Sequence, residues 1–118
     1  MPKVVAAGLI RYEQGTLRLD GIDLVLPGDM CTAQDGTHWP CGVIARTYFR
    51  NFLRGRALSC ITPGESWDDT LVTDCLINNQ DPAAWLVSHG WAMPKQGSAY
   101  EEMAGLARDG KKGIYGTD

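Results

Sequence analysis

Four cysteines are the residues whose chemistry is easiest to read from their spacing. They lie at positions 31, 41, 60 and 75, and no two of them form a C-x-x-C pair. This spacing argues against a zinc knuckle and against a thioredoxin-type redox site. An even number of cysteines in a small domain favours two disulfide bonds, which can be connected in three ways. We expect Cys31 to pair with Cys41 and Cys60 with Cys75, because the elements predicted below bring each pair together.

Two disulfides would place the chain in an oxidising compartment, because cytosolic conditions keep thiols reduced. No signal peptide is visible, since residues 1–3 lead directly into a strand-like run without an apolar leader or a cleavage site. An exported protein whose leader has been removed would account for both observations. We therefore expect a periplasmic or secreted location.

Composition sets limits on what the chain can bind. A length of 118 residues with 44% hydrophobic content is typical of one globular domain, expected here over residues 1–118. Eleven basic and fourteen acidic residues give a net charge of -3, which disfavours nucleic acid as a partner because no global positive field attracts phosphates. The longest apolar runs are far shorter than the ~20 residues of a membrane span, so no span is expected.

The two histidines do not indicate a metal site. His38 and His89 are far apart in the sequence, and neither has a ligand partner at metal-binding spacing. Surface or helix-end positions are therefore expected for both.

The hydrophobic pattern and the turn residues predict which elements must position these side chains. Alternating apolar residues favour strands, four-residue spacing favours helices, and a stretch rich in Gly, Asp, Thr and Pro favours a loop. On these grounds we expect strands at 3–7, 9–13, 16–22, 56–62 and 70–77, a loop at 27–40, and helices at 42–54, 82–87 and 98–108. Cys31 and Cys41 would close the loop, and Cys60 and Cys75 would face each other across the last two strands.

Capping residues support the two C-terminal helices. Asp81 followed by Pro82 is typical of an N-cap and a first helical position. Residues 98–101 read S-A-Y-E, which is the pattern of a capping box.

Exposed cations and aromatic residues are the remaining candidates for binding. Arg46, Arg50 and Arg54 line one side of the helix predicted at 42–54, where we expect a solvated face or, alternatively, a surface for an acidic partner. Trp85 and Trp91 are expected in the core. The two tryptophans in predicted loops, Trp39 and Trp67, are expected to form an exposed aromatic surface.

The order of elements predicts the fold class. Three strands, a helix, two strands and two helices are the arrangement of an OB-type, five-stranded barrel with three helices packed around it, an α+β fold that is mainly β barrel. The binding face of such a barrel is used for many different ligands.

Several segments carry a family resemblance. Residues 17–23 (L-R-L-D-G-I-D) resemble the R-L-x-G-I-D signature of the thermonuclease family, the staphylococcal-nuclease-like domains. Residues 39–42 (W-P-C-G) with Ala45 look like a stretch of its cysteine-containing bacterial branch. Residues 84–92 are similar to the end of a family helix, and Tyr100 with residues 107–115 resembles its C-terminal helix and aromatic stop. Their common order and spacing imply a staphylococcal-nuclease-like fold.

The resemblance also implies a site, from which key residues are missing. It assigns Arg18 to the reacting phosphate and Asp23 to a divalent cation. The family's Pro-Glu pair, which supplies the proposed general base, is replaced by 24–28 (L-V-L-P-G), and its first metal-binding aspartate by 5–8 (V-A-A-G). Asp69 stands where its second arginine is expected. Because one carboxylate provides only part of the oxygen ligands of a hard cation, and Asp20 should point to the opposite face, Asp23 alone is a weak metal site.

These departures favour a degenerate domain over a working nuclease. The leading hypothesis is a catalytically inactive domain that binds a protein or small ligand or has a structural role, with Arg18 and Asp23 kept as a structural pair and no cofactor. The alternative is a metal-dependent nuclease or phosphodiesterase in which Glu13, Asp68 or Asp69 joins Asp23 in binding Ca²⁺ or another divalent cation. A role in exopolysaccharide production rests only on labels within the bacterial branch.

Overall fold

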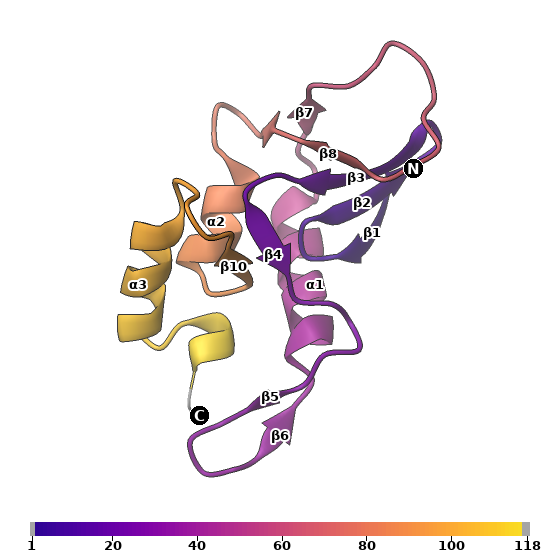
Figure 1. Cartoon of the computed structure of the whole chain (residues 1–118). Helices are drawn as coiled ribbons and strands as arrows, with labels where there is room; N and C mark the ends of the chain where they lie inside the picture. Colours follow the sequence, from indigo (N-terminus) through magenta and orange to yellow (C-terminus); the bar gives the residue numbers. More distant parts are fainter. Residues whose placement is uncertain (1, 117–118) are drawn as a thin grey trace.

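The computed structural model describes residues 2–116 and has an α+β architecture (Figure 1). Three α-helices and ten short strands lie within this range. The strands are β1 (Lys3–Ala6), β2 (Leu9–Tyr12), β3 (Gly15–Leu19), β4 (Ile22–Leu24), β5 (Cys31–Thr32), β6 (His38–Trp39), β7 (Ser59–Cys60), β8 (Leu71–Thr73), β9 (Cys75–Leu76) and β10 (Ala92–Pro94). The helices are α1 (Cys41–Leu53), α2 (Pro82–Ser88) and α3 (Glu101–Asp109), followed by a 3-10 turn, η1 (Gly113–Tyr115).

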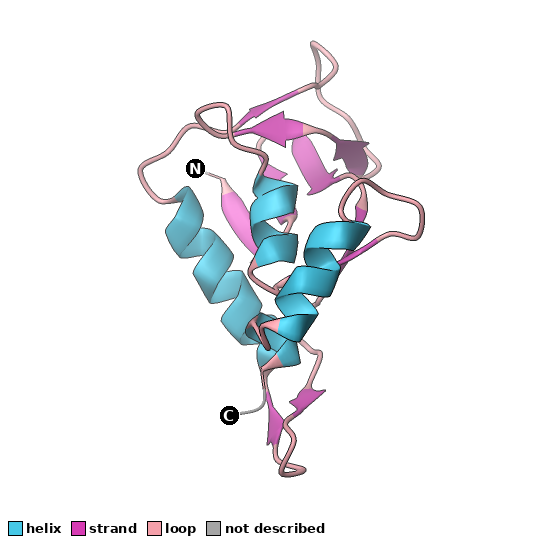
Figure 2. Cartoon of the chain, turned by 90° about the vertical axis from the view of Figure 1, so that its left-hand side faces the viewer, coloured by secondary structure: helices cyan, strands magenta, loops and turns pink. Residues whose placement is uncertain are grey.

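The main sheet has the strand order β1-β2-β3-β8. Strands β1, β2 and β3 are antiparallel neighbours, whereas β8 is parallel to β3 with Leu17 opposite Leu71. Leu17 and Leu19 of β3 are buried, as expected for alternate residues of a strand that faces a core. Figure 2 shows the helices gathered in front of the strands of this sheet. The core lies between these two layers and includes Phe49 of α1 and Leu86 of α2.

A closed barrel is not found among residues 2–116. Besides the main sheet, the strands form only two-stranded pairs: β4 with β10, β5 with β6, and β7 with β9. The chain bends after β3, where Gly21 has φ +83° and its N–H donates to Asp20 Oδ1 at 2.8 Å. Because of this bend β4 leaves the main sheet and pairs with β10. The predicted α+β class is confirmed, but the predicted five-stranded barrel is not.

Strand boundaries differ from the prediction where pairing is not local. The predicted loop at 27–40 contains the β5–β6 hairpin. The predicted strand at 70–77 divides into β8, which joins the main sheet, and β9, which alone pairs with β7. The predicted strand at 56–62 is reduced to the two residues of β7.

The helix ends agree with the prediction at α1 and α2 but not at α3. Asp81 Oδ1 accepts hydrogen bonds from the backbone N–H groups of Ala83 and Ala84, at 2.9 and 3.3 Å, so the predicted N-cap of α2 is confirmed. The predicted capping box at 98–101 is not formed as such. Helix α3 begins at Glu101, and its carboxylate accepts a hydrogen bond from Gly97 N–H instead.

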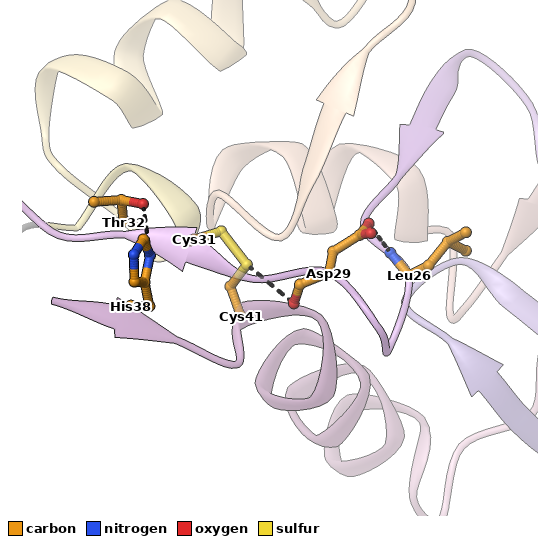
Figure 3. Close-up of a disulfide and its surroundings, with 6 residues drawn as sticks. All are labelled: Leu26, Asp29, Cys31, Thr32, His38 and Cys41. Carbon is orange, nitrogen blue, oxygen red and sulfur yellow. Dashed lines mark hydrogen bonds between the residues drawn. A yellow bond between two sulfur atoms is a disulfide. The ribbon is translucent and has the colours of Figure 1, made fainter. Parts of the chain in front are cut away.

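Both disulfides have the expected pairing. Cys31 is bonded to Cys41 with a Cα–Cα distance of 5.6 Å, and Cys60 is bonded to Cys75 with a Cα–Cα distance of 4.0 Å. The first bond joins β5 to the start of α1, and the carbonyl oxygen of Asp29 lies 3.8 Å from Cys41 Sγ (Figure 3). The two disulfides are consistent with an oxidising compartment. No helix within residues 2–116 is long and apolar enough to cross a membrane.

Candidate functional site

Arg18, the first residue implied by the resemblance, is used by the backbone. It lies half-buried on β3, and its Nη2 donates a hydrogen bond to the carbonyl oxygen of Ile22 at 2.7 Å. Its Nε is buried and has no hydrogen-bond partner among the described residues. The guanidinium therefore links β3 to the first residue of β4 across the bend.

Asp23, the residue expected to bind a metal, lies exposed on β4 opposite Met93 of β10. The nearby carboxylate of Asp20 is engaged by Gly21 N–H. Within residues 2–116, no group of three or more His, Cys, Asp or Glu side chains is arranged to hold a metal ion. Arg18 donates its hydrogen bond to a backbone carbonyl oxygen and not to the carboxylate of Asp23. Arg18 and Asp23 are related through their positions at the same bend.

The acids of the alternative hypothesis lie at the other end of β3. Because β8 is parallel to β3 with Leu17 opposite Leu71, the segment that carries Asp68 and Asp69 enters β8 at the end of the sheet where β3 begins. Trp67 N–H donates to the carbonyl oxygen of Gln14, which holds the loop beside the β2–β3 turn. Asp23 lies on β4, which follows the opposite end of β3, and β3 itself spans roughly 13 Å at ~3.3 Å per residue. The alternative hypothesis, in which Glu13, Asp68 or Asp69 joins Asp23 in binding an ion, therefore has no group of three such side chains to support it within residues 2–116.

The two loop tryptophans do not form the expected exposed surface. Both are half-buried and pack against the core. Trp67 Nε1 donates to the carbonyl oxygen of Thr16 at 2.7 Å, and the ring of Trp39 stands edge-on to Trp91 with centroids 6.4 Å apart. Their burial follows from tertiary contacts that loop composition does not reveal.

The arginines predicted to line the solvated face of α1 have different environments. Arg46 is half-buried, and its Nε has no hydrogen-bond partner in the part of the chain that the structure describes. Arg50 and Arg54 line a surface cavity of about 530 Å³ together with Arg56. The cavity lies between the C-terminal end of α1 and strands β1 and β2, and its apolar lining includes Val4, Ile10, Leu53 and Leu58.

Arg56 was missed as a site residue because the sequence places it in a predicted strand. In the structure it follows α1, where its Nη1 donates to the carbonyl oxygen of Phe52 and its guanidinium lies 5.2 Å from the centroid of the Phe52 ring. Phe52 in turn stacks on Trp85 with centroids 4.1 Å apart. Arg56 is thus held at the cavity by a carbonyl and by an anchored ring. The close spacing of Arg50, Arg54 and Arg56 in the sequence is the signal that could have indicated a shared cationic site.

Tyr12 supplies a polar group to the same cavity. It lies half-buried on β2, and burial raises the pKa of its phenol above the ordinary value. A tyrosine phenol is protonated at neutral pH even at its ordinary pKa of about 10, so the Tyr12 phenol can donate a hydrogen bond.

Comparison with known proteins gives no match: no family model matches the chain, and no curated protein matches it. The two regions that bear on function are the bend with Arg18 and Asp23 and the cavity at the end of α1.

Proposed function

We propose that this chain is a thermonuclease-like domain that acts as an exported binding module and not as a nuclease. The observation that carries the proposal is the arrangement of the residues that hydrolysis would need. Arg18 is hydrogen-bonded to the carbonyl oxygen of Ile22, and Asp23 is exposed with no metal-holding group of three among residues 2–116.

Phosphodiester cleavage requires more groups than Arg18 and Asp23 provide. Metal-assisted hydrolysis needs a cation fixed by several oxygen ligands and positive groups aimed at the charge that develops on the phosphate. Asp23 offers one carboxylate. In the proposed alignment Asp69 places a negative charge where a positive one is needed, and like charge repels an anionic substrate.

Two further features support a binding role in an exported protein. The disulfides Cys31–Cys41 and Cys60–Cys75 suit an oxidising compartment. The cavity beside α1 has the mostly apolar lining with a few polar groups that is typical of small-molecule sites.

A cleavage assay tests the absence of nuclease activity. The oxidised protein is incubated with single-stranded DNA or RNA and with Ca²⁺, Mg²⁺ or Mn²⁺, beside the variants Asp23→Asn and Asp69→Asn. We expect no cleavage above the rate of the variants. Metal-dependent cleavage that either substitution abolishes would refute the proposal.

A further inference from the structure

We propose that the cavity at the C-terminal end of α1 binds a small amphipathic anion, with an apolar chain inside the cavity and one carboxylate or phosphate group at the arginines. This inference rests on the proposed binding function and specifies its ligand class. None of the residues assigned to the degenerate nuclease site lines this cavity.

The interior of the cavity suits an apolar chain. Its volume of about 530 Å³ falls within the ~300–1,000 Å³ of small-molecule sites. Val4 and Ile10 form the side contributed by β1 and β2, and Leu53 and Leu58 lie at the end of α1 and beyond it. Ile10 is already fully buried, so an apolar chain placed here would cover the exposed parts of Val4, Leu53 and Leu58, which favours binding in proportion to the area covered.

The charge around the cavity is unbalanced. Arg50, Arg54 and Arg56 line it, and none of the lining residues identified, all within the described range, is acidic. The whole chain has a net charge of -3, so the charge of these three arginines is opposite in sign to the overall charge. Other cavities carry acids: Asp74 and Asp81 line one, and Glu65 lines another. An anionic ligand would provide the missing countercharge.

The polar groups favour a single carboxylate or phosphate. A planar guanidinium donates two parallel hydrogen bonds to either group. Arg56 is already oriented by the carbonyl oxygen and ring of Phe52, so less conformational entropy is lost when an anion binds. Tyr12 also lines the cavity, and its phenol is a neutral hydrogen-bond donor.

A polyanion fits this site less well than a small molecule. Nucleic acids are held by extended positive surfaces that contact many phosphates. Here three arginines from one segment line a mostly apolar cavity on a negatively charged chain. The ligand should therefore combine one anionic group with an apolar chain.

Titration calorimetry with four probes tests the proposal: decanoate and decyl phosphate below their micelle concentrations, decanol below its solubility limit, and acetate. The oxidised protein carries no N-terminal tag, since Pro2 lines the cavity. We expect at least one of the two long-chain anions to bind, at least about tenfold more tightly than decanol, and acetate to show no binding. The tighter of the two anions identifies the head group.

Substitutions locate the binding. The variant Arg50→Met/Arg54→Met keeps apolar stems but removes two charges, and we expect its affinity for the anion to fall about tenfold or more. Arg56 is left intact because it contacts the backbone of α1. Arg108→Met, an exposed arginine on α3 away from the cavity, is the matched control and should bind as the unchanged protein does.

The outcomes separate this proposal from the proposed function. Decanol binding as tightly as the anions, no binding of either anion below 1 mM, or an unchanged affinity of the double variant would each overturn the ligand assignment. Near-ultraviolet circular dichroism confirms that the variants are folded. Nucleic-acid cleavage in the separate assay would overturn the proposed function, whatever the result with these probes.

Discussion

One carboxylate links two helical segments of this protein, and removing it should cost more than the loss of a helix cap. Asp81 Oδ1 caps α2 by accepting from the backbone N–H groups of Ala83 and Ala84. Asp81 Oδ2 accepts a hydrogen bond of 2.5 Å from the phenol of Tyr100, the residue that precedes α3. Asp81→Ala therefore removes a cap and a long-range contact together.

The size of the effect follows from these contacts. Loss of an N-cap costs about 1 kcal/mol. Loss of a hydrogen bond to a charged group costs about 1.5 to 3 kcal/mol, and the partly exposed position of Tyr100 places it at the lower end. We expect Asp81→Ala to lower the free energy of unfolding by roughly 2 to 3 kcal/mol, and Tyr100→Phe by roughly 1 to 1.5 kcal/mol. In the double variant about 1 kcal/mol of coupling should appear, because both substitutions remove the same bond.

Urea unfolding of the oxidised proteins measures these differences. A change in midpoint at an unchanged slope reports stability alone. Asp68→Ala, an exposed loop acid, is the control and should change the free energy of unfolding by less than about 0.5 kcal/mol. Equal losses for Asp81→Ala and the control, or strictly additive effects of Asp81→Ala and Tyr100→Phe, would refute the reasoning.

Three further predictions concern packing, covalent restraint and pH. In urea unfolding, Gly42→Ala should lower the free energy of unfolding by about 2 kcal/mol or more, since its Cβ would lie 1.7 Å from the Leu26 carbonyl oxygen. The control Gly28→Ala should be nearly neutral, because a Cβ there would have nothing within 4 Å. Replacing Cys60 and Cys75 by serine should cost about 3 kcal/mol by the same measurement, the chain-entropy value for a loop of this size. Burial and the Asp81 hydrogen bond raise the pKa of Tyr100, so the stability of the folded state should fall as pH rises above about 10. Thermal unfolding at several pH values should show a smaller fall for Tyr100→Phe.

The sign of the pH effect comes from proton binding. Above the ordinary tyrosine pKa the unfolded chain releases the phenol proton while the folded chain retains it, so the folded state binds more protons and loses stability as pH rises. An alkaline slope equal in the two proteins would contradict this. Similar midpoints for Gly42→Ala and Gly28→Ala would contradict the packing argument, and a serine variant as stable as the oxidised protein would contradict the restraint argument.

Local signals account for the parts of the fold that were predicted well. The apolar spacing at 42–54 and the Asp81-Pro82 start at α2 identified both helices within one or two residues, because the information lies within a few residues of each element. The two disulfides followed from a hairpin-sized loop and an antiparallel pair, which are also local features.

Long-range pairing explains what was not predicted. Strand β10 is only three residues long and pairs with β4, nearly seventy residues earlier, so nothing beside it in the sequence marks it as a strand. Without β4 in the main sheet the expected barrel does not close. At the same bend Arg18 donates a hydrogen bond to the carbonyl oxygen of Ile22, and the register of β8 places the segment that carries Asp69 at the end of β3 opposite to β4.

The amino-acid sequence by itself determined the residue types, the helix starts and the cysteine pairs, because these depend on side-chain chemistry and on neighbours close along the chain. Tertiary structure decided which side chains share a site. Within residues 2–116 it assembled no group of three metal-binding side chains around Asp23, and it brought Arg50, Arg54 and Arg56 to one apolar cavity. The reason is that a functional site depends on the packing of distant segments, and here the packing of α1 against β1 places the arginines beside the sheet.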